Sequence, residues 1–425
     1  MTKIETKESS GENLAAQYQG CRGWTESLIR PLRPDDFMLQ ATPDTSPAKW
    51  HLAHTSWFFE TFVLAATVPG YRPVREDANY LFNSYYNAIG DRIARDRRGL
   101  MSRPTIDEVL AYRAEVDRRV IERLGVMSIA EASQIAPTVI LGLNHEQQHQ
   151  ELMLTDLKVA FGWNPLRPEY DGLDDAIEAD ATPLRWVAGG GELHRIGFAG
   201  NGFSFDNETP RHRVFLEPFT IASRPATNAE YLAFMDDGGY ARTEFWLSDG
   251  WATRSAAGWV SPMYWEERNR AWQVYTLGGM RPLALAEPVT HLSFYEADAF
   301  ARWSGARLPT EAEWETVAEG HPLSGNFAQS GRFHPTASPP VAAGLSAMYG
   351  DVWEWTGSPY VAYPGYRPAA GALGEYNGKF MCNQMILRGG SCVTPEGHIR
   401  QTYRNFFPPS ARWQFSGVRL ARDAG

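Results

Sequence analysis

The pattern of apolar residues changes once along this chain, near residue 162. Before that point, apolar residues recur at intervals of three and four, which is the spacing of amphipathic helices. After residue 185 the apolar runs are short and are separated by frequent Gly, Pro and Trp, which is typical of short strands and loops. A chain with these two halves is expected to adopt an α+β fold with two domains.

Four stretches of the first half have the helical period over enough residues to pack against one another. They are residues 13–32, 47–68, 105–125 and 129–162. Such helices favour an antiparallel bundle over residues 1–162. Residues 163–184 are rich in Pro and acidic side chains and predict a linker. The domain over residues 185–425 is expected to be irregular, with isolated helices at 227–240 and 293–306.

Composition favours an intracellular protein that acts on a small molecule. The formal net charge is −10, so neither nucleic acid nor an anionic membrane is an expected partner. The first residues lack the apolar segment of a signal peptide, and no apolar stretch is long enough to span a bilayer. Cys21, Cys382 and Cys392 are few and widely spaced, which indicates reduced thiols and a cytoplasmic location.

Residues 143–152, LNHEQQHQEL, place two histidines one helical turn apart. His145 and His149 would lie on one face of a helix, where both imidazoles can reach a single ion. The same letters form the HExxH motif of zinc peptidases, in which Glu146 would be the general base and Glu169 the third ligand. Prolines shortly before Glu169 oppose the helix that normally presents such a ligand, so the peptidase is kept as an alternative.

A third histidine ligand is predicted upstream, in the segment KWHLAHTSWFFE. His54 precedes Trp57 by three residues and Phe58 by four, so it shares the inward face of an amphipathic helix. An isolated core histidine usually satisfies itself with a hydrogen bond, but a His pair on another helix of the same bundle favours a three-histidine site. Three neutral imidazoles suit ferrous iron that binds an anion and dioxygen together, although zinc accepts the same ligands.

Segments in both halves resemble one family of enzymes. They are WHLAHTSWFFE, LFNSYYNAIGDRIARDRRGLMSRPT and NHEQQHQELML in the first half, and ETPRHRVFLEPFTIASRPATNAEY, RLPTEAEWE, GDVWEWT, LRGGS and RWQFSGVRLARD in the second. Together they resemble the nonheme-iron sulfoxide synthases of ergothioneine biosynthesis, the hercynine oxygenases. The resemblance covers nearly the whole chain, and it implies a DinB-like four-helix bundle joined to a formylglycine-generating-enzyme-like domain related to C-type lectins.

The resemblance implies Fe(II) as the metal, with His54, His145 and His149 as its ligands. His51 is then expected to be a structural residue. Glu146 is expected to serve the bundle or to contact a metal ligand, rather than to act as a general base. The family joins the sulfur of a thiol to the imidazole of hercynine, the trimethylated betaine of histidine. The oxidant is O2, and the product is a sulfoxide.

Residues that would bind hercynine follow from the same resemblance. Its quaternary ammonium cannot donate a hydrogen bond, so aromatic faces are expected to bind it. The segment YRNFFPP supplies Phe406 and Phe407, with Asn405 beside them as a polar anchor. Gln148 corresponds to a residue that faces hercynine in the family.

The carboxylate of the thiol substrate is expected to bind Arg95 and Arg98, which match a pair of arginines in the family. Members of the family use L-cysteine or gamma-glutamylcysteine, and an Asn-Trp-Asp run supplies the acid for the amine of the larger donor. The aligned residues here are Asn405, Phe406 and Phe407, without that acid. L-cysteine is therefore the expected donor, with gamma-glutamylcysteine as the alternative.

Tyr85 and Tyr86 resemble a tyrosine pair of the cysteine-using branch. There, a phenol near the iron is thought to deliver a proton or a hydrogen atom and to suppress plain dioxygenation of the thiol. The resemblance thus implies a catalytic phenol at one of these two positions. Without that role, the two tyrosines would be packing aromatics.

The second domain departs from true formylglycine-generating enzymes. Their cysteine pair is replaced by Thr394 and Ile399, and Cys392 directly follows Ser391. Oxidation of a sulfatase cysteine is thus not expected, and the domain should form a wall of the iron pocket. The alternatives are an ovothiol-type synthase that uses unmethylated histidine, a selenium-transferring relative, and a lectin-like binding protein with a structural metal.

Overall fold

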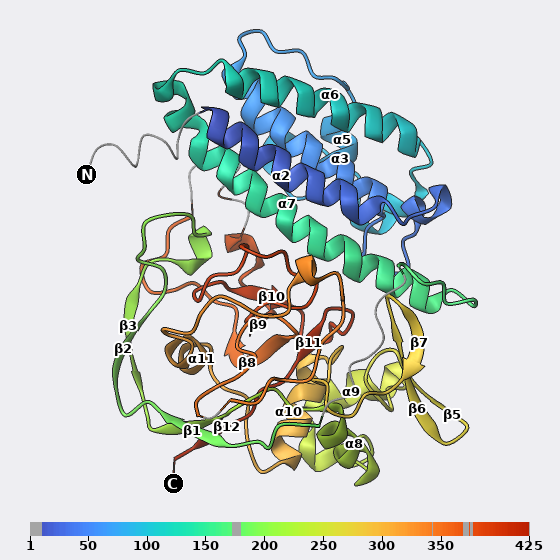
Figure 1. Cartoon of the computed structure of the whole chain (residues 1–425), viewed down its shortest axis with the longest axis vertical. Helices are drawn as coiled ribbons and strands as arrows, with labels where there is room; N and C mark the ends of the chain where they lie inside the picture. The colour runs from blue at the N-terminus through green and yellow to red at the C-terminus, as the bar shows by residue number, and fades with distance from the viewer. Residues whose placement is uncertain (1–10, 172–179, 342, 369–373, 375–376, 425) are drawn as a thin grey trace. The chain divides into compact units, whose positions relative to one another are not determined.

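The computed structural model describes residues 11–171, 180–341, 343–368, 374 and 377–424. The chain divides into two compact units, the first carrying the residues up to Trp163 and the second Asn164–Pro368 and Asn377–Gly425. The first unit is helical and the second combines strands, short helices and loops, so the fold is α+β (Figure 1). Of the predicted linker, residues 172–179 lie outside the described residues.

Four long helices of the first unit form a bundle. They are α2 (Gly11–Ile29), α3 (Ala48–Phe59), α6 (Ile106–Gly125) and α7 (Ile129–Trp163). Both α2 and α3 pack against α6 and α7 (Figure 1). The stretches with helical period are thus confirmed as helices. Among the described residues, no helix is both long and apolar enough to cross a membrane.

Short helical segments connect the long helices. They are the 3₁₀ turn Pro34–Met38, the π-helical turn Glu60–Leu64, α4 (Ala65–Thr67), α5 (Ala78–Phe82) and the 3₁₀ turns Asn87–Ile89 and Arg95–Leu100. These segments were not predicted from the sequence. The connection between α5 and α6 carries the predicted tyrosine pair and arginine pair.

Helix α6 buries one stripe of its surface, whereas helix α3 is buried on all sides. Helix α6 begins at a capping box, in which Thr105 Oγ1 accepts from the Glu108 amide at 3.2 Å and the Glu108 carboxylate accepts from the Thr105 amide at 2.6 Å. It buries one stripe that includes Val109, Val116 and Val120. Helix α3 is buried along its whole length, so its histidines are shielded from water.

The second unit contains small sheets in its described residues. One sheet has the order β10-β9-β8-β11, another the order β1-β4-β12, while β2 and β3 form a hairpin and β5, β6 and β7 a meander. The strands are β1 (Trp186–Gly189), β2 (Glu192–Ile196), β3 (His212–Leu216), β4 (Phe219–Ala222), β5 (Trp265–Arg268), β6 (Ala271–Thr276), β7 (Gly279–Pro282), β8 (Trp353–Pro359), β9 (Met385–Arg388), β10 (Asn405–Phe407), β11 (Ser416–Gly417) and β12 (Ala421–Asp423). The predicted irregular character of this half is confirmed.

Helices of the second unit begin at sequence signals that can be recognised. They are α8 (Asn228–Asp236), α9 (Ser248–Ala257), α10 (Phe294–Trp303) and α11 (Glu311–Val317). Helices α8 and α10 confirm the predictions for residues 227–240 and 293–306. Capping boxes start α8, α10 and α11, with Thr227, Ser293 and Thr310 as the capping residues.

A buried charge network joins α2, α6 and α7. Glu146 of α7 accepts hydrogen bonds from Arg22 Nη1 at 2.8 Å and from Arg113 Nη2 at 2.9 Å. Thr25 Oγ1 donates a third bond to this carboxylate at 2.6 Å. Burial alone would raise the pKa of Glu146, but the two arginines and Thr25 lower it to about 2. Glu146 is therefore charged and holds three helices together.

We expect Glu146→Ala to lower the free energy of unfolding by about 3 to 5 kcal/mol, because two buried guanidinium groups lose this partner. Because the folded state depresses the pKa of Glu146, its contribution should also decrease as the pH falls from about 4.5 toward 2. Urea denaturation followed by circular dichroism measures both effects. The control Arg118→Ala removes exposed ion pairs of α6 and should cost less than about 1 kcal/mol. Equal losses in the two variants would contradict the assignment.

Candidate metal centre

Three predicted histidine ligands converge inside the bundle. His54 Nε2 lies 3.1 Å from His145 Nε2, and His149 Nε2 lies 3.0 Å from that same atom. The candidate ligand atoms of the three residues all lie within 4.8 Å of one another. In the part of the chain that the structure describes, no other group of three His, Cys, Asp or Glu side chains is placed to hold a metal ion.

The packing of α3 against α7 brings the three rings together, since α3 carries His54 and α7 carries the other two. His145 and His149 are four residues apart, so they share one face of α7. His54 Nδ1 lies 2.5 Å from the carbonyl oxygen of Phe82, to which it donates. Its Nε2 therefore carries the lone pair and is available to a metal ion. A cation fits between the converging Nε2 atoms, because imidazole nitrogens are common ligands of transition metals.

The electrostatics of the cluster also favour a metal cation. Burial lowers the pKa of His54 and of His149 well below the usual value, and the neighbouring histidines lower both further. Burial lowers the pKa of His145 to about 3. All three rings are therefore neutral near pH 7, which is the form that binds metal ions.

Aromatic side chains enclose the histidines. Trp50 stacks on His54 with ring centroids 4.5 Å apart and an angle of 11° between the planes. Trp57 stacks on the same imidazole at 5.6 Å, and Phe58 lies 4.9 Å from His145. The prediction that His54 shares a buried face with Trp57 and Phe58 is confirmed. These rings fix the plane of His54 and exclude water from around it.

His51 does not belong to the cluster, but it contacts one of the predicted ligands. Its Nδ1 lies 2.8 Å from His149 Nδ1, and its Nε2 lies 3.1 Å from Asp156 Oδ2. Asp156 was not predicted from the sequence. A signal was present, because Asp156 follows His149 by seven residues, which places both on the same face of α7.

The two predicted arginines differ strongly in burial. Arg95 is exposed, whereas Arg98 is buried with its guanidinium 3.3 Å from the centroid of the Trp50 ring. Arg98 Nη1 donates to Ser46 Oγ at 2.8 Å, and Nη2 donates to Ser84 Oγ at 3.3 Å. Burial and the nearby Arg95 lower the pKa of Arg98. Within the described residues no carboxylate forms an ion pair with Arg98, so its desolvated charge is favourable for an anion.

The tyrosine pair lies close to the aromatic shell. Tyr86 is buried, with its ring 5.7 Å from that of Trp57, which itself stacks on His54. Tyr85 is half-buried and lies 4.7 Å from Tyr86. Gln148 is half-buried on α7, directly before His149. The first unit thus brings the tyrosine pair close to the rings that enclose the histidine cluster.

The remaining predicted residues belong to the second unit. Asn405, Phe406 and Phe407 form strand β10, which pairs with β9. Phe406 stacks on Tyr360 with ring centroids 4.0 Å apart and an angle of 9° between the planes. Phe407 meets Trp413 edge-on at 6.0 Å. The segment is half-buried, so it presents part of an aromatic surface.

The positions of the formylglycine-generating cysteines have a structural role here. Thr394 Oγ1 accepts a hydrogen bond from the Ser391 amide at 2.8 Å, and Ile399 is buried. Cys21, Cys382 and Cys392 are all free, as the sequence predicted. The geometry offers no cysteine pair for oxidation at this place.

The structure also disfavours the peptidase. Glu146 binds Arg22 and Arg113 rather than the histidine cluster, so it is not placed as a general base. The third member of the cluster is His54 and not Glu169. The expectation that Glu146 serves the bundle is confirmed.

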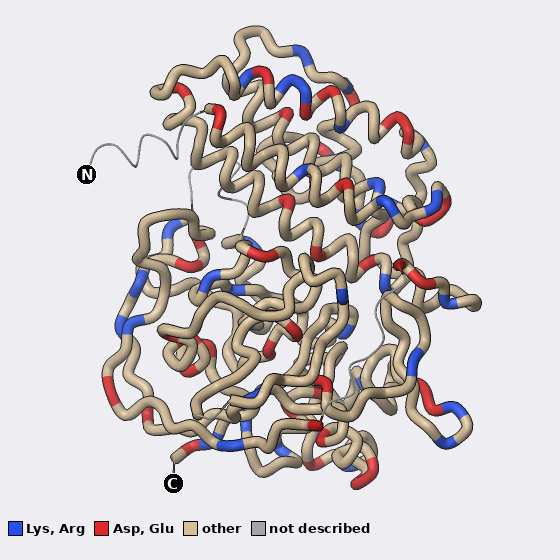
Figure 2. The backbone as a smooth tube through the Cα atoms, in the orientation of Figure 1, with Lys and Arg blue, Asp and Glu red and all other residues tan. Residues whose placement is uncertain are grey.

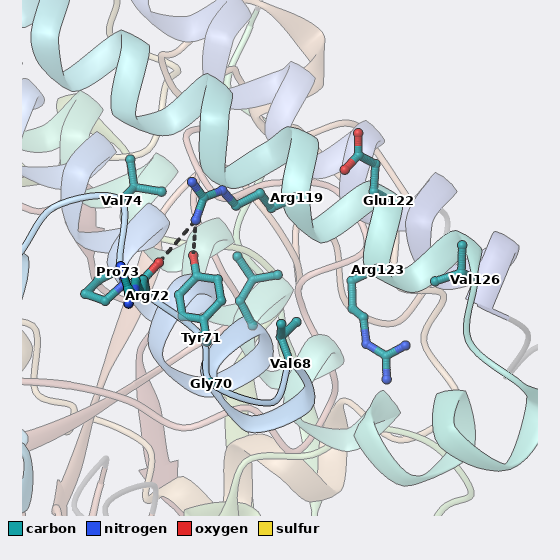
Figure 3. A pocket seen from close by; sticks show the side chains of 11 residues that line it. Val68, Gly70, Tyr71, Arg72, Pro73, Val74, Arg119, Glu122, Arg123 and Val126 are labelled. Carbon is teal, nitrogen blue, oxygen red and sulfur yellow. Dashed lines mark hydrogen bonds between the residues drawn. The ribbon is translucent and has the colours of Figure 1, made fainter.

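A pocket of 800 Å³ opens beside α6, and Figure 3 shows it from close by. Leu64 and Val126 are among its lining residues. On one side Arg119 donates to the Tyr71 hydroxyl at 3.3 Å and to the Arg72 carbonyl at 3.2 Å. None of the predicted site residues lines this pocket, so it is distinct from the metal centre.

Two family models match the chain. The DinB superfamily model matches residues 17–153, and the sulfatase-modifying factor enzyme 1-like domain matches residues 180–341 and 326–424. The first match falls on the helical bundle and the second on the unit that contains the sheets. The predicted fold class is therefore confirmed.

Three similar proteins place these domains in context. The chain is 33% identical to a hercynine oxygenase of Mycolicibacterium smegmatis, over 94% of this chain and 96% of that protein. It is 32% identical to a hercynine oxygenase of Mycobacterium tuberculosis, over 98% and 100%. A formylglycine-generating enzyme of Streptomyces coelicolor is 30% identical, but the match covers 55% of this chain. Since the first two matches span both units, the chain belongs to the hercynine oxygenase family.

Proposed function

We propose that this chain is an iron(II)-dependent sulfoxide synthase that joins the sulfur of L-cysteine to hercynine in ergothioneine biosynthesis. The product would be S-(hercyn-2-yl)-L-cysteine S-oxide. In the balanced reaction an imidazole C–H and the thiol S–H are lost, one atom of O2 enters the sulfoxide, and the other leaves in water. The observation that carries the proposal is the convergence of three neutral histidines, joined by no carboxylate of the described residues, in a chain of this family.

His54, His145 and His149 would hold the iron. Because these ligands are neutral, they leave the charge of a divalent ion uncompensated, which favours an anionic substrate such as a thiolate. Ferrous iron bound there would supply positions at which a thiolate, the hercynine imidazole and O2 come together. Trp50 and Trp57 hold the plane of one ligand and keep bulk water out.

Arg98, together with Arg95, is proposed to bind the carboxylate of L-cysteine. Arg98 has a desolvated charge, and among the described residues its Nε–H has no hydrogen-bond partner. Its bonds to two serines and its stacking on Trp50 orient the guanidinium before any substrate arrives. A preorganised guanidinium is well suited to bind a carboxylate through two hydrogen bonds.

Phe406 and Phe407 are proposed to bind the quaternary ammonium of hercynine. Contacts of a cation with an aromatic face contribute roughly 0.5 to 2 kcal/mol each. Asn405 and Gln148 would supply polar contacts to the same substrate. The absence of an acid at position 407 supports L-cysteine, rather than gamma-glutamylcysteine, as the donor.

We expect the Fe(II)-loaded chain to consume O2 only when hercynine and L-cysteine are both present. Replacing His54, His145 or His149 by Ala should abolish iron binding and O2 uptake, since each removes one of three ligands. Iron analysis and an oxygen electrode measure the two effects. His321→Ala changes a histidine outside the cluster and serves as the control. Uptake that does not require hercynine would contradict the proposal.

The donor preference gives a second test. With hercynine saturating, kcat/KM for L-cysteine should exceed that for gamma-glutamylcysteine, because no acid at position 407 binds the amine of the larger donor. Phe407→Asp should shift the ratio toward gamma-glutamylcysteine by roughly tenfold, the value of one charge-assisted hydrogen bond. Phe407→Leu, which adds no charge, should leave the ratio unchanged. Equal specificity of the wild-type chain for both donors would refute this assignment.

Tyr85 and Tyr86 are proposed to supply the proton or hydrogen atom that directs the reaction to the sulfoxide. Without this donor, O2 should instead oxidise cysteine to the sulfinic acid. We therefore expect Phe at one of these positions to raise the ratio of sulfinate to sulfoxide, as quantified by mass spectrometry. Tyr80→Phe, on the exposed side of α5, should not change it. An unchanged ratio in both single variants and the double variant would leave the pair a packing role only.

A further inference from the structure

A continuous series of hydrogen bonds runs from Arg98 to the candidate ligand His149. Arg98 Nη1 donates to Ser46 Oγ at 2.8 Å, and the Ser46 amide donates to Asp156 Oδ2 at 2.8 Å. The same Asp156 oxygen lies 3.1 Å from His51 Nε2. His51 Nδ1 in turn lies 2.8 Å from His149 Nδ1. All five residues are buried, so water does not compete for these bonds.

The partners of Asp156 decide where the protons of this series lie. The Ser46 amide can only donate, so Oδ2 of Asp156 is an acceptor. His51 Nε2 then donates to Asp156, and in the neutral tautomer that carries this proton His51 Nδ1 is an acceptor. His149 accordingly donates from Nδ1 and keeps the lone pair on Nε2. That nitrogen is the one that faces His145 in the cluster.

We propose that His51 and Asp156 are positioning residues that fix the tautomer and the ring orientation of His149 for metal binding. The inference rests on the proposed function, because it deepens the description of the same metal centre. The sequence predicted only a structural role for His51, whereas the proposal gives it the additional role of orienting His149.

On α3, one hydrogen bond to the backbone orients the candidate ligand His54. His54 Nδ1 donates to the carbonyl of Phe82, so the backbone alone sets its tautomer. On α7 the carbonyl groups near His149 are engaged within the helix, so an acceptor must come from a side chain. His51, backed by Asp156, supplies it. Loss of such outer partners typically lowers metal affinity by about 10- to 100-fold.

Titration of the full-length apoprotein with Co(II), followed by its ligand-field absorption, tests the proposal. His51→Phe keeps an aromatic ring but removes both nitrogens, and Asp156→Leu removes the acceptor. Both substitutions are expected to raise the dissociation constant of Co(II) by about 10- to 100-fold and to alter the ligand-field spectrum of the bound ion. Asp156→Asn keeps a neutral acceptor oxygen and should restore affinity to within a few-fold of the wild type. Ser46→Ala keeps the amide that binds Asp156 and should leave the affinity unchanged.

Two outcomes would overturn the inference. One is wild-type affinity and spectrum in both His51→Phe and Asp156→Leu. The other is an equal loss in all four variants, accompanied by a lower melting temperature, because that pattern reports general damage to the bundle. Failure of the proposed function appears differently: O2 uptake by the Fe(II)-loaded wild-type chain would then not require hercynine, whatever the Co(II) affinities of the variants.

Discussion

The contact of α3 with α7 is the constraint on which the histidine cluster depends. His54 approaches His145 across this contact, and every residue of α3 is buried. A shift of one residue along either helix would turn a ligand by about 100° around its axis and disperse the cluster. The register is held by Glu146, which binds Arg22 of α2 and Arg113 of α6. The residue that suggested a peptidase base therefore keeps α7 in the rotation that presents its histidines.

Glu146 and the histidines of α7 have different environments. The charged carboxylate of Glu146 is paired with two guanidinium groups, which offset the cost of its burial. The histidines are neutral and enclosed by aromatic rings. A metal ion bound there would lose its hydration water and gain three nitrogen ligands. This separation lets one helix serve both stability and chemistry.

Much of the first unit could be predicted from the sequence, because its signals are local. The stretch 105–125 became Ile106–Gly125, and the spacing of His54 from Trp57 was enough to place it inward. The contact of Asp156 with His51 could not be predicted in the same way, and neither could the stacking of Arg98 on Trp50. Their partners are far away in sequence, and only the packing of the helices selects them. The second unit was harder for the same reason, since β4 pairs with β12 across about half of the chain.

The positive charges around the histidine cluster affect how a metal ion and an anionic substrate would bind there. Arg98 contributes to lowering the pKa of both His54 and His149, and its guanidinium lies against Trp50. A divalent ion at the histidines would add more positive charge to a region where no described carboxylate pairs with Arg98. In the proposed function, the carboxylate of an anionic thiol substrate would meet the charge of Arg98 and its thiolate the charge of the metal ion, so one substrate would offset both positive charges. On that proposal the metal and the anion would bind more favourably together than either one alone.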